Sequence, residues 1–255
     1  MNTTPQVAVV TGGAGGLGSV IATELTRDGF QVVLADRDHE AAETVAKQIH
    51  QDGGLRPIAH AVDITDGSAV HTMIDEIDQR FGRLDVIVNN AGIERFSTLA
   101  DMPEDAWAQT MDVNVRGPML LCKHAVPLWK RQGSGSVVNI SSRAWIGGSK
   151  NTAYASSKAA IVGFTRSMAA ELGPIGVRAN AVAPSFVRTP LNEQRTDVEH
   201  LETMIGQYAA FTPLRRLIDP IDVAYAVAFL ASERARNITG EVVHVCAGSQ
   251  LPPTV

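Results

Sequence analysis

The chain has 255 residues, of which 45% are hydrophobic and 19% are charged, and its formal net charge is −5. This composition is typical of a globular protein with a large core, and the lack of a basic surplus argues against a nucleic acid or an anionic membrane as partner. Cys122 and Cys246 stand outside any C-x-x-C or Cys/His pattern, so we expect neither a disulfide scaffold nor a metal site. We find no signal-peptide pattern and no apolar run that could span a bilayer, and we therefore expect a cytoplasmic location.

Short apolar runs that predict strands alternate with amphipathic segments that predict helices. The expected strands are residues 7–10, 31–35, 58–62, 84–88, 135–140, 177–182 and 241–245. The expected helices are residues 19–28, 40–51, 70–81, 103–130 (interrupted near Asn114 and at Gly117-Pro118), 152–172, 198–208 and 222–230. This alternation predicts one α/β domain over residues 1–255, with a parallel sheet between two helical layers. The less regular segment at about 185–215 is interpreted as a lid.

A glycine-rich turn follows the first expected strand directly, with Gly12, Gly16 and Gly18 inside the segment Thr11–Gly18. Glycine allows the backbone to turn tightly and to approach a phosphate, and the N-terminus of the following helix offers free N–H groups and a partial positive charge. Strand, turn and helix in this order predict a nucleotide-phosphate loop, although the spacing differs from G-x-G-x-x-G. A merely flexible loop is the alternative.

The second expected strand ends at Asp36-Arg37. A carboxylate at this position can accept a hydrogen bond from a ribose 2′-hydroxyl and would repel a 2′-phosphate, which favours NAD. Arg37 complicates this prediction, because an arginine nearby can accommodate the phosphate of NADP. We give Asp36 more weight, since it occupies the end of the strand.

Two further strands end in small or polar residues. The third is followed by Asp63-Ile64, and the fourth by Asn89-Asn90-Ala91-Gly92. In an open α/β sheet, ligands bind at the carboxyl ends of the strands, so these residues are candidates for contact with a cofactor. An asparagine-rich turn without such a role is the alternative.

Tyr154 and Lys158 are four residues apart in an expected helix and therefore lie on one face. A nearby ammonium lowers the pKa of a phenol, which lets a tyrosine exchange a proton during interconversion of a carbonyl and an alcohol. Taken alone, the spacing is weak evidence, because a packed tyrosine beside a lysine that extends to solvent is the commoner explanation for it.

These motifs are joined by others, and the whole set runs in one order: Thr11-Gly12-x-x-x-Gly16-x-Gly18, Asp63, Asn89-Asn90-Ala91-Gly92, Asn114, Ser142, Tyr154-x-x-x-Lys158, Pro184 with Thr189-Pro190, and Asp222-Val223-Ala224. In this order they resemble the short-chain dehydrogenase/reductase family from end to end. The resemblance implies a single-domain Rossmann fold, with a seven-stranded parallel sheet flanked by helices on both faces and a small lid between strand 6 and the last helix.

The resemblance also implies roles for individual residues. Asn114, Ser142, Tyr154 and Lys158 would be catalytic: Tyr154 as general acid/base, Lys158 as the residue that lowers its pKa and binds the nicotinamide ribose, Ser142 as the ligand of the substrate oxygen, and Asn114 as the holder of a relay water. The implied cofactor-binding residues are Gly12, Gly16, Leu17, Gly18, Asp36, Arg37, Asp63, Ile64, Asn90, Ala91, Gly92, Tyr154, Lys158, Pro184, Val187 and Thr189.

Three departures from the family pattern stand out. Ser141 has the usual spacing of thirteen residues before the tyrosine, whereas Ser142 matches the usual place after the strand, and we favour Ser142. Ser185 replaces a common glycine. Cys246-Ala247-Gly248 stands where Asp-Gly-Gly is common.

The sequence therefore predicts an NAD-dependent oxidoreductase that interconverts a small-molecule secondary alcohol and its ketone. The alternatives are an NADPH-dependent 3-ketoacyl-thioester reductase and, with less support, an NAD-binding sensor without activity. The resemblance also implies a homotetramer. The sequence does not identify the alcohol or ketone. The candidate walls of the substrate pocket are Glu94, Arg95, Arg143, Trp145, Phe186 and residues 191–211.

Overall fold

The computed structural model describes residues 5–147, 149–187 and 198–251. The described chain forms a seven-stranded sheet in the order β3-β2-β1-β4-β5-β6-β7, and every paired neighbour is parallel. Its strands are β1 Val7–Thr11, β2 Gln31–Asp36, β3 Ile58–Ala61, β4 Val86–Asn89, β5 Gly135–Ile140, β6 Val177–Pro184 and β7 Val242–Val245. This is the predicted Rossmann sheet.

The α-helices lie where the apolar periodicity predicts them. They are α1 Gly16–Arg27, α2 His39–Gln51, α3 Gly67–Phe81, α4 Glu104–Met111, α5 Gly117–Gln132, α6 Thr152–Leu172, α8 Val198–Phe211 and α9 Pro220–Ala231. A π-helical turn, η1 Asp112–Arg116, joins α4 to α5, and short 3-10 turns are η2 Arg143–Trp145, η3 Gly173–Ile175 and η4 Glu233–Ala235.

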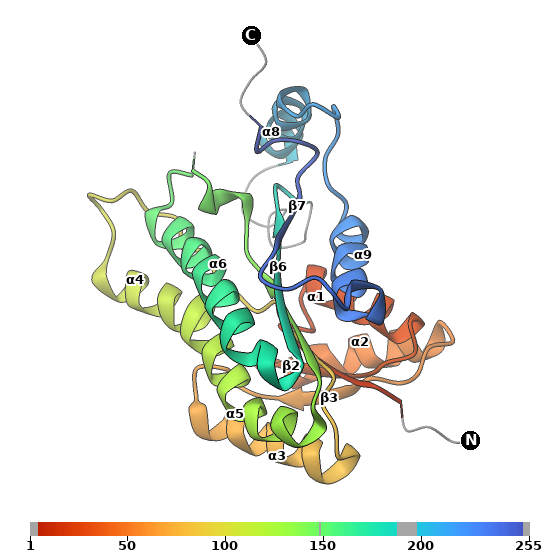
Figure 1. Cartoon of the computed structure of the whole chain (residues 1–255). Helices are drawn as coiled ribbons and strands as arrows, with labels where there is room; N and C mark the ends of the chain where they lie inside the picture. Colours follow the sequence, from red (N-terminus) through yellow and green to blue (C-terminus); the bar gives the residue numbers. More distant parts are fainter. Residues whose placement is uncertain (1–4, 148, 188–197, 252–255) are drawn as a thin grey trace.

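Helices cover both faces of the sheet (Figure 1). One buried apolar cluster joins the sheet to α1, α2 and α9, and a second joins it to α3, α5 and α6. The central strands are buried on both sides; residues 7–10 of β1, for example, have no exposed surface. Burial of both faces explains why these strands are continuous apolar runs and do not alternate with polar residues.

Polar contacts fix the ends of several helices. The Asp38 side chain accepts a hydrogen bond from the Ala41 backbone N–H at 2.9 Å and so caps α2. At the other end of the chain, the Arg178 guanidinium donates to the Leu230 carbonyl at 2.8 Å and satisfies the last turn of α9. Because Arg178 lies on β6, this contact also docks α9 on the sheet.

The crossover order places the carboxyl ends of all seven strands at one edge of the sheet. β1 and β4 are neighbours although they are far apart in the chain, which makes the boundary between them the point where the strand order reverses. α8 lies on the same side as this edge, between β6 and α9 in the chain (Figure 1). This is the position expected for the lid.

Candidate active site

Helix α6 carries Tyr154 and Lys158 in its first two turns. Asn151 is its N-cap, is 1% exposed, and accepts a hydrogen bond from the Tyr154 backbone N–H at 3.2 Å. Two contacts hold the helix against the sheet: Asn139 on β5 donates to the Thr165 hydroxyl at 2.8 Å, and the hydroxyl of Ser141, the residue after β5, donates to the Lys158 carbonyl at 2.9 Å. The catalytic candidates therefore sit on a helix whose position is fixed by buried polar contacts.

The Lys158 ammonium is buried at the end of β5. Its side chain is 4% exposed, its Nζ donates to the Ile140 carbonyl at 2.8 Å, and Nζ lies 5.5 Å from the centre of the Tyr154 ring. Burial lowers the pKa of Lys158 to about 8, and the Glu94 carboxylate opposes this shift. The predicted pairing of a phenol with an ammonium is thus present in space, and burial of the ammonium lowers the pKa of Lys158.

Asn114 occupies the π-helical turn between α4 and α5, which is the interruption that the sequence predicts there. It is 1% exposed and clamps Ile93, since its Oδ1 accepts from the Ile93 N–H at 2.8 Å and its Nδ2 donates to the Ile93 carbonyl at 3.0 Å. Nδ2 also lies 3.0 Å from the Ser157 hydroxyl, which donates to the Tyr154 carbonyl at 2.7 Å. These contacts connect the loop after β4, the π turn and helix α6.

The two candidate serines have different surroundings. Ser141 is 2% exposed, and its hydroxyl is engaged with the Lys158 backbone carbonyl. Ser142 is half-buried, and its hydroxyl accepts from the Ala144 N–H at 3.2 Å. The Ser142 proton therefore stays available for a further acceptor, whereas Ser141 already donates its proton to the protein.

The glycine-rich turn is held against the end of β4. Thr11 Oγ1 accepts the backbone N–H groups of Asn90 and Ala91, both at 3.0 Å. The Asn90 amide donates to the Thr11 carbonyl at 2.9 Å and to the Gly12 carbonyl at 3.2 Å. Gly12 has φ +62°, a left-handed conformation that favours glycine, and a Cβ on Gly18 would lie 2.0 Å from the Gly12 carbonyl oxygen.

The N-terminus of α1 follows this turn and includes Gly16, Leu17 and Gly18. Its N-cap is Gly15, which provides no side-chain hydrogen bond. The first N–H groups of this helix therefore lack a side-chain cap, which fits an anion at this end.

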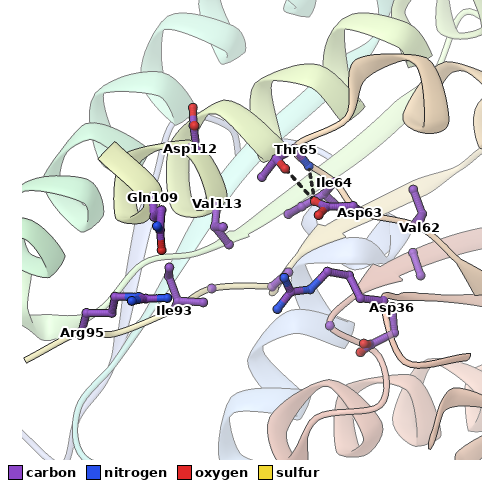
Figure 2. Close-up of a pocket in the computed structure, with 15 residues that line it drawn as sticks. Asp36, Val62, Asp63, Ile64, Thr65, Ile93, Arg95, Gln109, Asp112 and Val113 are labelled. Carbon is purple, nitrogen blue, oxygen red and sulfur yellow. Dashed lines mark hydrogen bonds between the residues drawn. The ribbon is translucent and has the colours of Figure 1, made fainter. Parts of the chain in front are cut away.

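A cavity of about 400 Å³ opens beside this turn (Figure 2). Seven of the predicted cofactor residues line it, namely Gly12, Asp36, Arg37, Asp63, Ile64, Ala91 and Gly92. Asp36 lies at one end of the cavity, while Arg95 and Gln109 lie at the other (Figure 2). A pocket of this size, between a glycine-rich turn and the strand ends, fits one half of a dinucleotide.

Two carboxylates of this cavity are fixed by the backbone. Asp36 accepts the Ala14 N–H at 3.0 Å and the Asp38 N–H at 3.1 Å, which ties the glycine-rich turn to β2. Asp63 accepts the hydroxyl and the N–H of Thr65 at 2.7 and 2.8 Å (Figure 2). These hydrogen bonds hold the pKa of Asp63 below its usual value, and the Arg37 guanidinium adds to the shift. Arg37 therefore lines the cavity and also interacts electrostatically with Asp63.

The remaining predicted residues lie around the end of β6. Pro184 is its last residue, and Val187 is 7% exposed and bridges to Ile218. Thr189 lies outside the described residues, as does most of the first half of the expected lid. Two aromatic pairs border this region: Phe186 packs on Tyr208 of α8, and the Trp145 indole N–H lies 3.2 Å from His244 Nε2.

Several residues that build the site are missing from the sequence-based set. Ser157 and Asn151 bond to the backbone of α6 at Tyr154, and Thr65 orients Asp63. An aspartate side chain commonly accepts a hydrogen bond from the residue two positions on in a turn, so the contact between Asp63 and Thr65 could be predicted from the sequence. The roles of Asn151 and Ser157 depend on partners far along the chain and leave no local signal.

The described residues contain no group of three or more His, Cys, Asp or Glu side chains that could bind a metal ion. Among the described helices, none is both long and apolar enough to cross a membrane.

Comparison with known proteins gives one consistent picture. A family model described as enoyl-(acyl carrier protein) reductase matches residues 12–250. The 3-oxoacyl-[acyl-carrier-protein] reductase FabG of Staphylococcus aureus is 38% identical over 246 residues, which cover 96% of this chain and 98% of that protein. The (2S)-[(R)-hydroxy(phenyl)methyl]succinyl-CoA dehydrogenase subunit BbsD of Thauera aromatica is 35% identical, with 96% of this chain and 97% of that protein covered.

Solved structures agree with the sequence relatives. A short-chain type dehydrogenase/reductase from Mycobacterium marinum superposes with a TM-score of 0.90 at 29% identity, covering 97% of this chain and 96% of that chain. A gluconate 5-dehydrogenase from Burkholderia cenocepacia, solved in complex with NADP and tartrate, gives a TM-score of 0.88 at 28% identity with the same coverage.

Proposed function

This chain belongs to the short-chain dehydrogenase/reductase family, and from this premise we propose that it is an NAD-dependent enzyme that interconverts a secondary alcohol and its ketone. The observation that carries the proposal is the Lys158 ammonium, buried 5.5 Å from the Tyr154 ring at the carboxyl edge of the sheet. A tyrosine that lies beside a lysine with a lowered pKa is a group suited to proton transfer.

The residues present fit a nicotinamide dinucleotide. Glycines 12, 16 and 18 and the free N–H groups of α1 would hold the pyrophosphate, and Asp36 would accept a ribose hydroxyl. Asp63 and Ile64 would border the adenine, Asn90 to Gly92 the middle of the cofactor, and Pro184, Val187 and Thr189 the nicotinamide end. When bound, the cofactor supplies the hydride chemistry; the protein supplies alignment and proton transfer.

The proposed roles of the catalytic residues follow from their contacts. Tyr154 takes the hydroxyl proton during oxidation and returns it during reduction. Ser142 donates its free proton to the substrate oxygen and stabilises the charge that develops there. The positive charge of Lys158 favours the Tyr154 phenolate. Asn114 holds the loop after β4 through Ile93, and in the proposed mechanism its π-helical turn would hold a relay water.

A second function is favoured by the relatives. FabG and BbsD are named for acyl-thioester substrates, which supports a 3-ketoacyl-thioester reductase that would use NADPH. The solved gluconate 5-dehydrogenase holds NADP, so NADP use has precedent within the fold. Asp36 argues against a 2′-phosphate in this chain, and we therefore place NAD first.

We also propose a single catalytic domain, a cytoplasmic location and a homotetramer. The family supports the tetramer, and the two buried free cysteines fit a reducing compartment. Light scattering coupled to size-exclusion chromatography measures the assembly directly.

The test is cofactor reduction by the purified chain with NAD⁺ and, separately, NADP⁺. The panel should contain cyclic, aromatic and aliphatic secondary alcohols and one 3-hydroxyacyl thioester. We expect NADH formation with at least one simple alcohol. Turnover confined to NADP⁺ and the thioester would establish the alternative function and overturn the proposed one.

A further inference from the structure

We propose that Glu94 is a positioning residue for the reaction, an inference that rests on the proposed function. Asn151 holds the Glu94 carboxylate near α6, and this carboxylate keeps Lys158 in its charged form. Glu94 lies two residues beyond Gly92, in the loop that follows β4. The sequence places Glu94 among the candidate walls of the substrate pocket but gives it no part in the proton transfer.

The loop that carries Glu94 is fixed at both ends. Asn114 clamps Ile93 with two hydrogen bonds at 2.8 and 3.0 Å. On the other side, the Asn151 amide donates to the Arg95 carbonyl at 3.2 Å and lies 3.4 Å from Glu94 Oε1. Because Asn151 is 1% exposed and also caps α6 at the Tyr154 N–H, it joins the Glu94 loop directly to the catalytic helix.

This loop passes close to Lys158. A Cβ built on Gly92 would lie 3.5 Å from Lys158 Nζ and 3.3 Å from Asn114 Oδ1. Tyr154, on the same helix, has its ring centre 5.5 Å from the ammonium, and the Glu94 carboxylate on the loop is the charged group that acts on the pKa of Lys158. The β5 strand contributes the neutral Ile140 carbonyl, and the π turn contributes the neutral Asn114 amide.

The electrostatic consequence has a definite sign. Burial lowers the pKa of Lys158 to about 8, and Glu94 is the charge that raises it. Without Glu94 the lysine would lose its proton at a lower pH. A neutral Lys158 would bind ribose hydroxyls more weakly and would no longer favour the Tyr154 phenolate.

The experiment measures NADH affinity by fluorescence between pH 6 and 9.5, so it does not depend on turnover. For the unmodified chain, the dissociation constant should be flat at low pH and should rise above a break near the pKa of Lys158. In Glu94→Gln the break should move to lower pH by about 0.5 to 1 unit. In Glu94→Asp, which keeps the negative charge, the break should stay close to that of the unmodified chain. Glu104→Gln, which removes the same charge from the exposed start of α4, is the matched control and should leave the break unchanged.

A second variant tests the part played by Asn151. Serine is a good N-cap but lacks the amide donor, so Asn151→Ser keeps the cap of α6 and releases the Glu94 loop. We expect the same downward shift of the break. ADP, which has no second ribose, should bind with no such break in any variant.

The outcomes separate the two proposals. If neither the unmodified chain nor its variants bind NADH, the proposed function is wrong. If NADH binds but Glu94→Gln or Asn151→Ser leaves the break in place, or weakens binding equally at every pH, the role of Glu94 is wrong and its contacts are structural only.

Discussion

At the scale of single residues, the two candidate serines differ in whether the hydroxyl proton is already donated to another group of the protein. Ser141 and Ser142 are adjacent. The spacing to Tyr154 favours Ser141 as the catalytic serine, whereas the position after the strand favours Ser142. The structure separates them physically, because Ser141 donates to the Lys158 carbonyl from a buried position and Ser142 does not. This makes the pair a direct test of the proposed catalytic set.

Ser142→Ala should reduce turnover by about 100-fold or more with little change in thermal stability, because it removes a donor to the substrate oxygen. Ser141→Ala should instead lower the free energy of unfolding by about 1 kcal/mol through the lost hydrogen bond, with a modest loss of activity. Steady-state kinetics and denaturant unfolding measure both effects. The reverse pattern would assign catalysis to Ser141.

In the proposed function, the choice between NAD and NADP depends on Asp36. Asp36→Asn keeps an acceptor for the Ala14 N–H but removes the charge that repels a 2′-phosphate. The preference for NAD⁺ over NADP⁺ should fall by about tenfold or more. Kd values for NADH and NADPH measure this ratio. An unchanged ratio would mean that Arg37, and not Asp36, sets the specificity.

Long-range contacts of this kind mark the limit of prediction at the residue scale. Asp36, Asn114 and Tyr154 were identified from position and pattern. The contacts that hold the site together were not predicted. Asn114 bonds to Ile93, and Asn151 bonds to Arg95, only after the chain has folded and brought these distant segments together. Periodicity describes each element separately and carries no information on which side chains of different elements will touch.

At the scale of elements, apolar periodicity predicted every described strand and α-helix to within a few residues. The region after Pro103 is more instructive. Interruptions were expected near Asn114 and at Gly117-Pro118. The first is the π turn over Asp112–Arg116, whereas at Gly117-Pro118 the chain stays helical as α5 begins. Pro118 is tolerated because it lies in the first turn of α5, where its missing N–H has no required partner.

Two glycines in helices give a matched test of the glycine-rich turn. Gly18→Ala would place Cβ 2.0 Å from the Gly12 carbonyl oxygen, so the turn must move, and NADH affinity should fall by roughly tenfold or more. Gly163→Ala in α6 meets nothing within 4 Å and should raise helix stability by up to about 1 kcal/mol, with NADH affinity unchanged. Fluorescence titration and thermal melting compare them. Equal NADH affinity in the two variants would contradict the phosphate-loop interpretation.

At the scale of the whole molecule, the parallel sheet buries its central strands under two helical layers, and Cys122 lies inside one of them. Its side chain is 3% exposed, and burial raises its pKa to about 12. In a Cys246→Ser background, Cys122 should not react with a thiol reagent in the native state and should react on unfolding, at the same denaturant concentration as the loss of helical circular dichroism. Rapid labelling of the native protein would mean that α5 opens locally.

The fold itself was predictable because strand and helix alternation leaves few topologies for a parallel sheet. The substrate was not, because the candidate walls of the substrate pocket lie mostly on loops, whose conformation periodicity does not describe. Trp145 illustrates this: its hydrogen bond to His244 joins a turn after β5 to the edge strand, a contact that no motif signals.

The central claim is that Tyr154 exchanges the substrate proton, and Tyr154→Phe tests it most directly. The measurement is kcat for alcohol oxidation together with NADH affinity, for the unmodified chain and the variant, with the best alcohol of the panel. We predict a loss of kcat of about 10²- to 10⁴-fold, because the phenol proton is exchanged in the reaction, and an NADH affinity within about threefold of the original. A variant that keeps most of its activity would contradict the account.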